Sequence, residues 1–120
     1  MSKIVIYEDD GPMRALLQEW LGEVGYRVRA AAGPAGRAAE DADLVIVSVY
    51  MPKQAGMQRV REARAAHPQT PLIAISSQFR SGLSTAGATA QLLGVDQVIA
   101  KPLVRESLLD AVRDIIGPPS

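Results

Sequence analysis

Short apolar runs alternate along the chain with segments whose apolar positions recur at helical spacing. Five runs are typical of strands, at residues 4–7, 26–30, 44–51, 72–75 and 97–100. The runs at 44–51 and 72–75 are apolar or small throughout, which indicates parallel strands buried on both faces. The run at 26–30 alternates apolar and polar residues, which indicates a strand near a sheet edge.

Helices are expected in the five segments between and after these runs. Asp10 is placed to cap the first helix, whose apolar positions follow from Met13 to Val24 at helical spacing, and Gly25 is placed to end it. Another helix is expected after Gly56, running to about residue 66, and a last one over 105–116. Two weaker helical segments are expected at 35–40 and within 78–93.

Five strands alternating with five helices predict a doubly wound α/β domain. Right-handed crossovers favour the flavodoxin-like (βα)5 arrangement, a five-stranded parallel sheet with the order 2-1-3-4-5. We expect residues 1–117 to form this domain and residues 118–120 to be a C-terminal tail. Strands one and three would then be neighbours, and their carboxyl ends carry Glu8, Asp9 and Ser48.

Composition narrows the classes of partner. Lys and Arg together number 13, as do Asp and Glu, so the formal net charge of +0 argues against a nucleic acid or a lipid surface as partner. The absence of cysteine excludes disulfides and thiolate metal sites. No apolar stretch has the length of a membrane span, and the N-terminus lacks the apolar core of a signal peptide, so we expect a cytoplasmic protein.

Five short motifs occur in chain order, each beside a predicted strand. They are Glu8-Asp9 after the first strand, Asp43-Leu44-Val45 at the third, Met51-Pro52 with Gly56 behind it, Ser76 after the fourth, and Lys101-Pro102 after the fifth. Together they resemble a response-regulator receiver domain of two-component signalling, and the resemblance covers essentially the whole chain. Each motif is weak alone, but five in order at these spacings are specific.

The resemblance implies roles for individual positions. In receivers two acidic residues hold Mg²⁺, here Glu8 and Asp9, and an Asp at the end of strand three accepts a phosphoryl group from a histidine kinase. A hydroxyl and a lysine then bind the phosphoryl oxygens, which implies Ser76 and Lys101. An aromatic residue on strand five reorients. This chain has Ser48 at the acceptor position and Val98 at the aromatic position.

Ser48 changes the chemistry that the site can perform. A carboxylate is a nucleophile at neutral pH, whereas a serine hydroxyl must lose its proton to a base. Lys101 beside two carboxylates would be held protonated and is a poor base. Conventional aspartyl phosphorylation at position 48 is therefore excluded, no catalytic residue is assigned, and Glu8 and Asp9 are expected to bind Mg²⁺ weakly or not at all.

Simpler interpretations remain open for several of these residues. The acids at positions 8–10 suit a helix N-terminus, because the helix macrodipole favours negative charge there. Ser76 could simply end a strand or cap a helix. His67 precedes a proline in a loop and is expected to be solvated, and Trp20 lies on the apolar stripe of the first helix and is expected to be core.

We expect a single-domain atypical receiver that acts by protein–protein interaction and is not an enzyme. Its partner would be a histidine kinase, a phosphotransfer protein, another receiver or a second copy, bound through the last helix and fifth strand. One alternative is a receiver phosphorylated at another acid such as Asp10, or an acceptor-substituted form of an active receiver. A small flavodoxin-like enzyme or cofactor binder is less favoured, since strand one is followed by no glycine-rich phosphate motif.

Overall fold

The five predicted strands form one parallel sheet in the computed structural model, which describes residues 3–8, 10–30, 42–48, 53–76, 95–100 and 104–118. The strands are β1 (Lys3–Tyr7), β2 (Arg27–Ala30), β3 (Leu44–Ser48), β4 (Leu72–Ser76) and β5 (Gln97–Ala100). Their order is β2-β1-β3-β4-β5, so the predicted flavodoxin-like topology is confirmed.

Strand β3 lies at the centre of this sheet. All five of its residues are buried, and it pairs with β1 through Ile4↔Leu44 and with β4 through Ile46↔Ile73. The apolar run predicted to continue through residues 49–51 leaves the described residues after Ser48. Strand β2 lies at an edge, and its Arg27 and Arg29 side chains are exposed, as the alternating pattern predicted.

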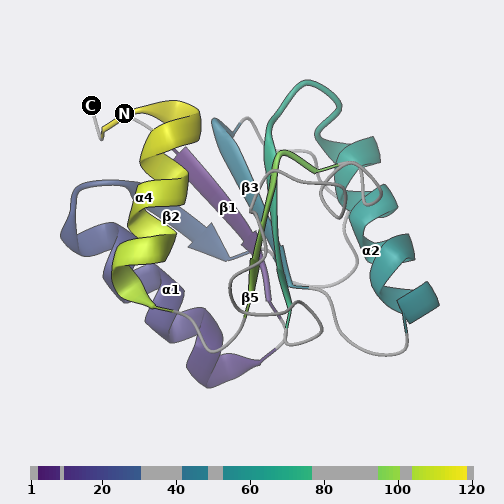
Figure 1. The fold of residues 1–120 in the computed structure, drawn as a ribbon, viewed down its shortest axis with the longest axis horizontal. Coiled ribbons are helices and arrows are strands. Elements are labelled where there is room, and N and C mark those ends of the chain that lie inside the picture. Colours follow the sequence, from purple (N-terminus) through teal and green to yellow (C-terminus); the bar gives the residue numbers. More distant parts are fainter. Residues whose placement is uncertain are drawn as a thin grey trace.

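Helices cover both faces of the sheet. Helices α1 (Gly11–Glu23) and α4 (Arg105–Ile116) pack on one face, and α2 (Lys53–Ala66) packs on the other (Figure 1). The range of α4 and the end of α2 agree with the sequence prediction, whereas α2 begins at Lys53, before Gly56, after which the helix was predicted to begin. The helices predicted at 35–40 and within 78–93 lie outside the described residues.

Alternation along the strands divides the core between these two faces. Even-numbered residues of β1 and β3 face α1 and α4, and odd-numbered residues face α2. The buried core of the α1/α4 face consists of Ile4, Ile6, Leu17, Leu21, Tyr26, Leu44, Ile46, Ile73, Ile75, Ile99, Leu108, Leu109, Ala111 and Val112. That of the α2 face consists of Val5, Tyr7, Val45, Val47, Val60, Ala63, Leu72, Ala74, Val95 and Val98.

The ends of α1 are as predicted. Asp10 is its N-cap, with Oδ2 accepting the Met13 N–H at 3.0 Å, which satisfies one of the free donors of the first turn. Gly25 follows the helix with φ 107°, a left-handed conformation that favours glycine. Trp20 is half-buried against the core of the α1/α4 face, as its position on the apolar stripe predicted.

Tyr26 joins the start of β2 to the end of α4. Its hydroxyl donates a hydrogen bond to the Gly117 carbonyl oxygen at 2.7 Å, across 91 residues of sequence. Burial raises the pKa of this hydroxyl, and the Arg113 guanidinium acts in the opposite direction. The neutral hydroxyl therefore satisfies a carbonyl that the helix end leaves without an intrahelical partner.

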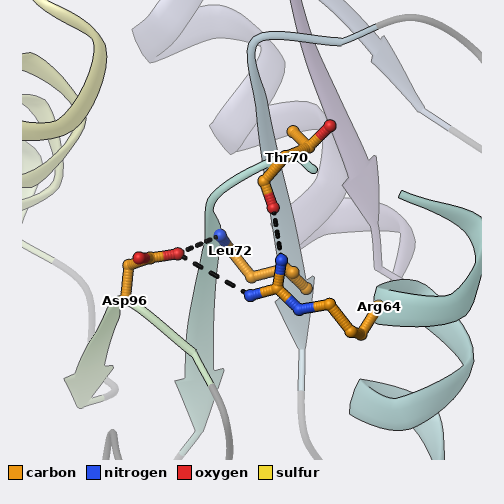
Figure 2. A network of polar contacts seen from close by, with 4 residues as sticks. All are labelled: Arg64, Thr70, Leu72 and Asp96. Carbon is orange, nitrogen blue, oxygen red and sulfur yellow. Dashed lines mark hydrogen bonds and ion pairs between the residues drawn. The ribbon is translucent and has the colours of Figure 1, made fainter. Parts of the chain in front are cut away.

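A polar network fixes the amino edge of the sheet (Figure 2). Asp96 Oδ2 accepts the Leu72 N–H at 2.8 Å and lies 3.8 Å from Arg64 Nη2, while Arg64 Nη1 donates to the Thr70 carbonyl at 2.8 Å. The network joins the end of α2, the loop before β4 and the residue before β5. It lies at the edge opposite the candidate site and has a structural role.

Candidate functional site

The strand register places the predicted site residues along the carboxyl edge of the sheet. Tyr7 pairs with Val47, so Glu8 and Ser48, which follow them, lie side by side at the ends of β1 and β3. Ser48 pairs with Ile75, and the next residue of β4 is Ser76. Open α/β sheets bind ligands at this edge, where the strand order reverses between β1 and β3.

Ser48 is a buried hydroxyl at the end of the central strand. It is 1% exposed, and its Oγ has no hydrogen-bond partner within the described part of the chain. Alternation places it on the α1/α4 face, in line with Leu44 and Ile46.

Glu8 is also buried and is held by the segment that enters α1. It is 1% exposed, and its Oε1 accepts the Asp10 N–H at 3.3 Å. Its backbone carbonyl accepts a hydrogen bond from Arg14 Nη1 at 3.2 Å. The turn between β1 and α1 therefore fixes Glu8, while Asp10 points its carboxylate into the first turn of the helix.

The donor set at this edge determines how well it suits Mg²⁺, which prefers several oxygen ligands in octahedral geometry. Glu8 supplies one carboxylate and Ser48 one neutral oxygen. Within the described ranges, no three His, Cys, Asp or Glu side chains gather in a group that could hold a metal. Asp9, the second predicted metal ligand, lies outside the described residues, so Glu8 is the described member of the predicted pair.

Of the remaining predicted site residues, the structure describes Ser76 and Val98 but not Lys101. The backbone of Ser76 pairs with Ala100, the last residue of β5, so position 76 lies at the same edge of the sheet as Ser48. Lys101 itself lies outside the described residues. Val98 is 3% exposed in the core of the α2 face, where it is a packed aliphatic side chain.

The prediction that His67 is solvated is wrong. His67 is 3% exposed, and its Nε2 lies 2.8 Å from the Tyr7 hydroxyl. Its backbone N–H donates to the Ala63 carbonyl at 2.9 Å, so the helical hydrogen bonding of α2 continues one residue past Ala66. The following proline suggested a loop, but His67 continues the buried stripe of Val60 and Ala63 at i+7 and i+4. That spacing was the signal that could have identified it.

None of the helices within the described residues is long and apolar enough to cross a membrane.

Comparison with protein-family models gives one family for this arrangement. The model described as "Response regulator receiver domain" matches residues 4–113, which include all five strands. The match thus covers Glu8, Ser48 and the other positions at the carboxyl edge.

Individual relatives agree with this match. The chain is 31% identical over 121 residues to the transcriptional regulatory protein CpxR of Escherichia coli K12, a match that covers 97% of this chain and 50% of that protein. The chain thus spans about half the length of the curated relatives that it matches.

Solved structures show the same fold. The response regulator TrrA from Thermotoga maritima, solved in complex with Mg²⁺ and BeF, has a TM-score of 0.71 and 26% identity, covering 96% of this chain and 99% of that one. A CheY-like receiver domain protein from Methanospirillum hungatei has a TM-score of 0.76 and 21% identity, covering 95% of this chain and 92% of that one.

Proposed function

The chain belongs to the response regulator receiver domain family of two-component signalling, and on that premise we propose that it acts by protein–protein interaction without phosphorylation at position 48. Ser48 carries this proposal. It occupies the end of the central strand beside Glu8, which is where the family resemblance puts the acceptor aspartate, and it offers a buried hydroxyl instead. A hydroxyl needs a base to become a nucleophile, and a phosphoserine ester would lack the lability of an acyl phosphate.

Other acids at the edge do not replace the missing acceptor well. Asp10 is the best alternative because it is exposed, but its Oδ2 already accepts the Met13 N–H as the N-cap of α1. A phosphoryl group on Asp10 would compete with that cap, which is worth about 0.5–2 kcal/mol. We therefore place phosphorylation at Asp10 second to a receiver that works without it.

Magnesium binding is expected to be weak, with saturation only at millimolar concentration or above. Ser48 removes one carboxylate from the ligand set, leaving Glu8 and Asp9 as the acids. A Mg²⁺ titration followed by Trp20 fluorescence measures the affinity of the native chain. In the matched Ser48→Asp variant the affinity should rise by at least about tenfold, because an added carboxylate attracts the cation strongly at a partly buried site. Saturation of the native chain at micromolar Mg²⁺ would contradict this expectation.

The outer surface of α4 supports an interaction role. The side chains of Glu106, Asp110, Arg113 and Asp114 are exposed, and Val104 at the N-cap is 57% exposed. Mixed charges along the exposed surface of α4 suit a protein partner chosen by charge complementarity. We propose a histidine kinase, a phosphotransfer protein or another receiver as the partner, with a second copy of this chain as the alternative, bound through α4 and β5.

A binding assay with the cytoplasmic part of candidate histidine kinases tests the proposed function. The native chain should bind with equal affinity with and without a phosphoryl donor. Reversing the charge of Asp110 and Asp114 to Lys should weaken binding by about tenfold, the equivalent of ~1.4 kcal/mol. The control is Glu19→Lys, which reverses an exposed charge on α1. Binding that requires the donor, or that both sets of changes weaken equally, would contradict the proposal.

A further inference from the structure

The side chain of Arg14 folds over the turn that leads from β1 into α1. Arg14 lies near the start of α1 and is half-buried, and its Nη1 donates to the Glu8 carbonyl oxygen at 3.2 Å. Its Nη2 lies over Gly11, where an added Cβ would be 3.9 Å away. The side chain therefore points back toward the N-terminus of the helix, the direction that helical side chains favour.

The carbonyl that Arg14 binds lies just beyond the paired part of β1. Tyr7 is the last residue of β1 and pairs with Val47, and Glu8 follows it. A guanidinium is a charged donor, and hydrogen bonds from charged donors are stronger than those between neutral groups. Arg14 thus fixes the backbone of Glu8 at the point where strand pairing stops.

The Glu8 carboxylate is joined to the same turn through Asp10. Glu8 Oε1 accepts the Asp10 N–H at 3.3 Å, and the Asp10 carbonyl accepts the Arg14 N–H at 2.9 Å as the first hydrogen bond of the helix. Arg14 therefore binds the turn at two carbonyls, one through its side chain and one through its backbone. The carboxylate of Glu8 contacts the backbone between them, so its place depends on the shape of this turn.

We propose that Arg14 is a positioning residue of the candidate site, which holds the Glu8 carboxylate at the carboxyl edge of the sheet before any cation binds. A ligand that is already fixed in place loses less conformational freedom on binding, so it binds more tightly. The positioning of Glu8 does not depend on whether position 48 accepts a phosphoryl group, so it goes beyond the proposed function.

Charge and positioning predict opposite effects of removing the Arg14 side chain. The guanidinium is a positive charge near Glu8, and like charges repel, so its loss should by itself strengthen the binding of Mg²⁺. Loss of positioning should weaken that binding instead. The sign of the change in affinity therefore separates the two roles.

The first measurement compares Arg14→Met with Arg14→Lys in the full ¹⁵N-labelled chain. Met can neither donate nor carry a charge, whereas Lys keeps the charge and a donor, which suffices for one bond to a carbonyl. The backbone order parameters of Glu8 and Asp10 should be about 0.85 in the native chain and in Arg14→Lys, and should fall toward about 0.6 in Arg14→Met. Those of Leu17 and Leu21 should stay unchanged, which excludes a general loosening of α1.

The second measurement is a Mg²⁺ titration of the Ser48→Asp chain, with and without a change at Arg14. Adding Arg14→Met should raise the dissociation constant for Mg²⁺ by about three- to tenfold, the effect of losing one hydrogen bond. Adding Arg14→Lys should leave it within about twofold. The control is Arg27→Met, which removes the same charge from the exposed start of β2, at the opposite edge of the sheet, and should leave the constant unchanged.

Two results would overturn this role for Arg14. One is Mg²⁺ binding that is unchanged or tighter when Arg14→Met is added, and the other is an Arg14→Met chain in which the Glu8 and Asp10 amides stay rigid. Failure of the proposed function has a different signature, which is phosphoryl uptake by the native chain. Such uptake would leave the positioning of Glu8 by Arg14 in place.

Discussion

Replacing Ser48 by Asp should give a chain that forms an acyl phosphate with acetyl phosphate and Mg²⁺, whereas the native chain should form none. The change restores an ionised carboxylate at the end of β3, next to Glu8. Such a group attacks phosphorus without a base, which the Ser48 hydroxyl cannot do. Intact-mass spectrometry detects the added phosphoryl group, and its loss on hydroxylamine treatment identifies the acyl linkage.

The same substitution should lower stability when Mg²⁺ is absent. Glu8 and position 48 are both 1% exposed, so a second carboxylate adds a like charge to a buried site. Mg²⁺ should recover much of this loss, because the cation binds the folded site and not the unfolded chain. Urea denaturation with and without Mg²⁺ measures both effects.

The control variants for phosphoryl uptake are Ser48→Ala and Asp10→Asn. Ser48→Ala should behave as the native chain does, because neither side chain can accept a phosphoryl group under these conditions. Uptake by the native chain that Asp10→Asn abolishes would show that the acceptor has moved to Asp10. A Ser48→Asp chain that remains unlabelled would contradict the expectation that position 48 alone accounts for the lost chemistry.

The largest loss of stability is expected from Ile46→Ala. Ile46 is 0% exposed at the middle of β3, where it pairs with Ile6 of β1 and Ile73 of β4. Removing its three outer carbons loses transfer free energy and leaves a cavity, so the free energy of unfolding should fall by about 2–5 kcal/mol. That is a large part of the ~5–15 kcal/mol that stabilises a typical domain.

Val104→Ala is the matched control for Ile46→Ala. It also shortens an aliphatic side chain, but Val104 is 57% exposed and makes no side-chain hydrogen bond as the N-cap of α4. Its effect on the free energy of unfolding should stay within about 0.5 kcal/mol. Urea denaturation of both variants measures the two losses in the free energy of unfolding. Equal losses would contradict the expectation that the buried Ile46 contributes more to stability than the exposed Val104.

The fold could be predicted because its signals are local and agree with one another. The continuous apolar run from Leu44 gave the buried strand β3, and the alternation around Arg27 and Arg29 gave the edge strand β2. Asp10 and Gly25 gave the ends of α1 because capping depends on residues close in sequence. Chain order and handedness then left few arrangements of the sheet.

Contacts between distant residues were harder to predict. The Tyr7–His67 contact spans 60 residues, and Asp96 binds the Leu72 N–H across 24. Neither pair has a sequence signature, because each depends on how the elements pack. Local reasoning favoured a solvated His67 because a proline follows it, but burial of the α2 stripe decided its environment. The candidate site was easier to predict than these contacts and harder than the helix ends. Its residues are distant in sequence, but each lies at the end of a predicted strand, and the predicted strand order brings those ends together.

The exposed arginines of β2 have a consequence for self-association. An edge strand offers unpaired backbone groups on which another sheet can grow, and charged side chains oppose such growth. Two copies joined through β2 would bring Arg27 and Arg29 of one chain close to the same residues of the other, and like charges on paired strands repel. Repulsion at this edge disfavours a continuous intermolecular sheet and the aggregation that could follow from it.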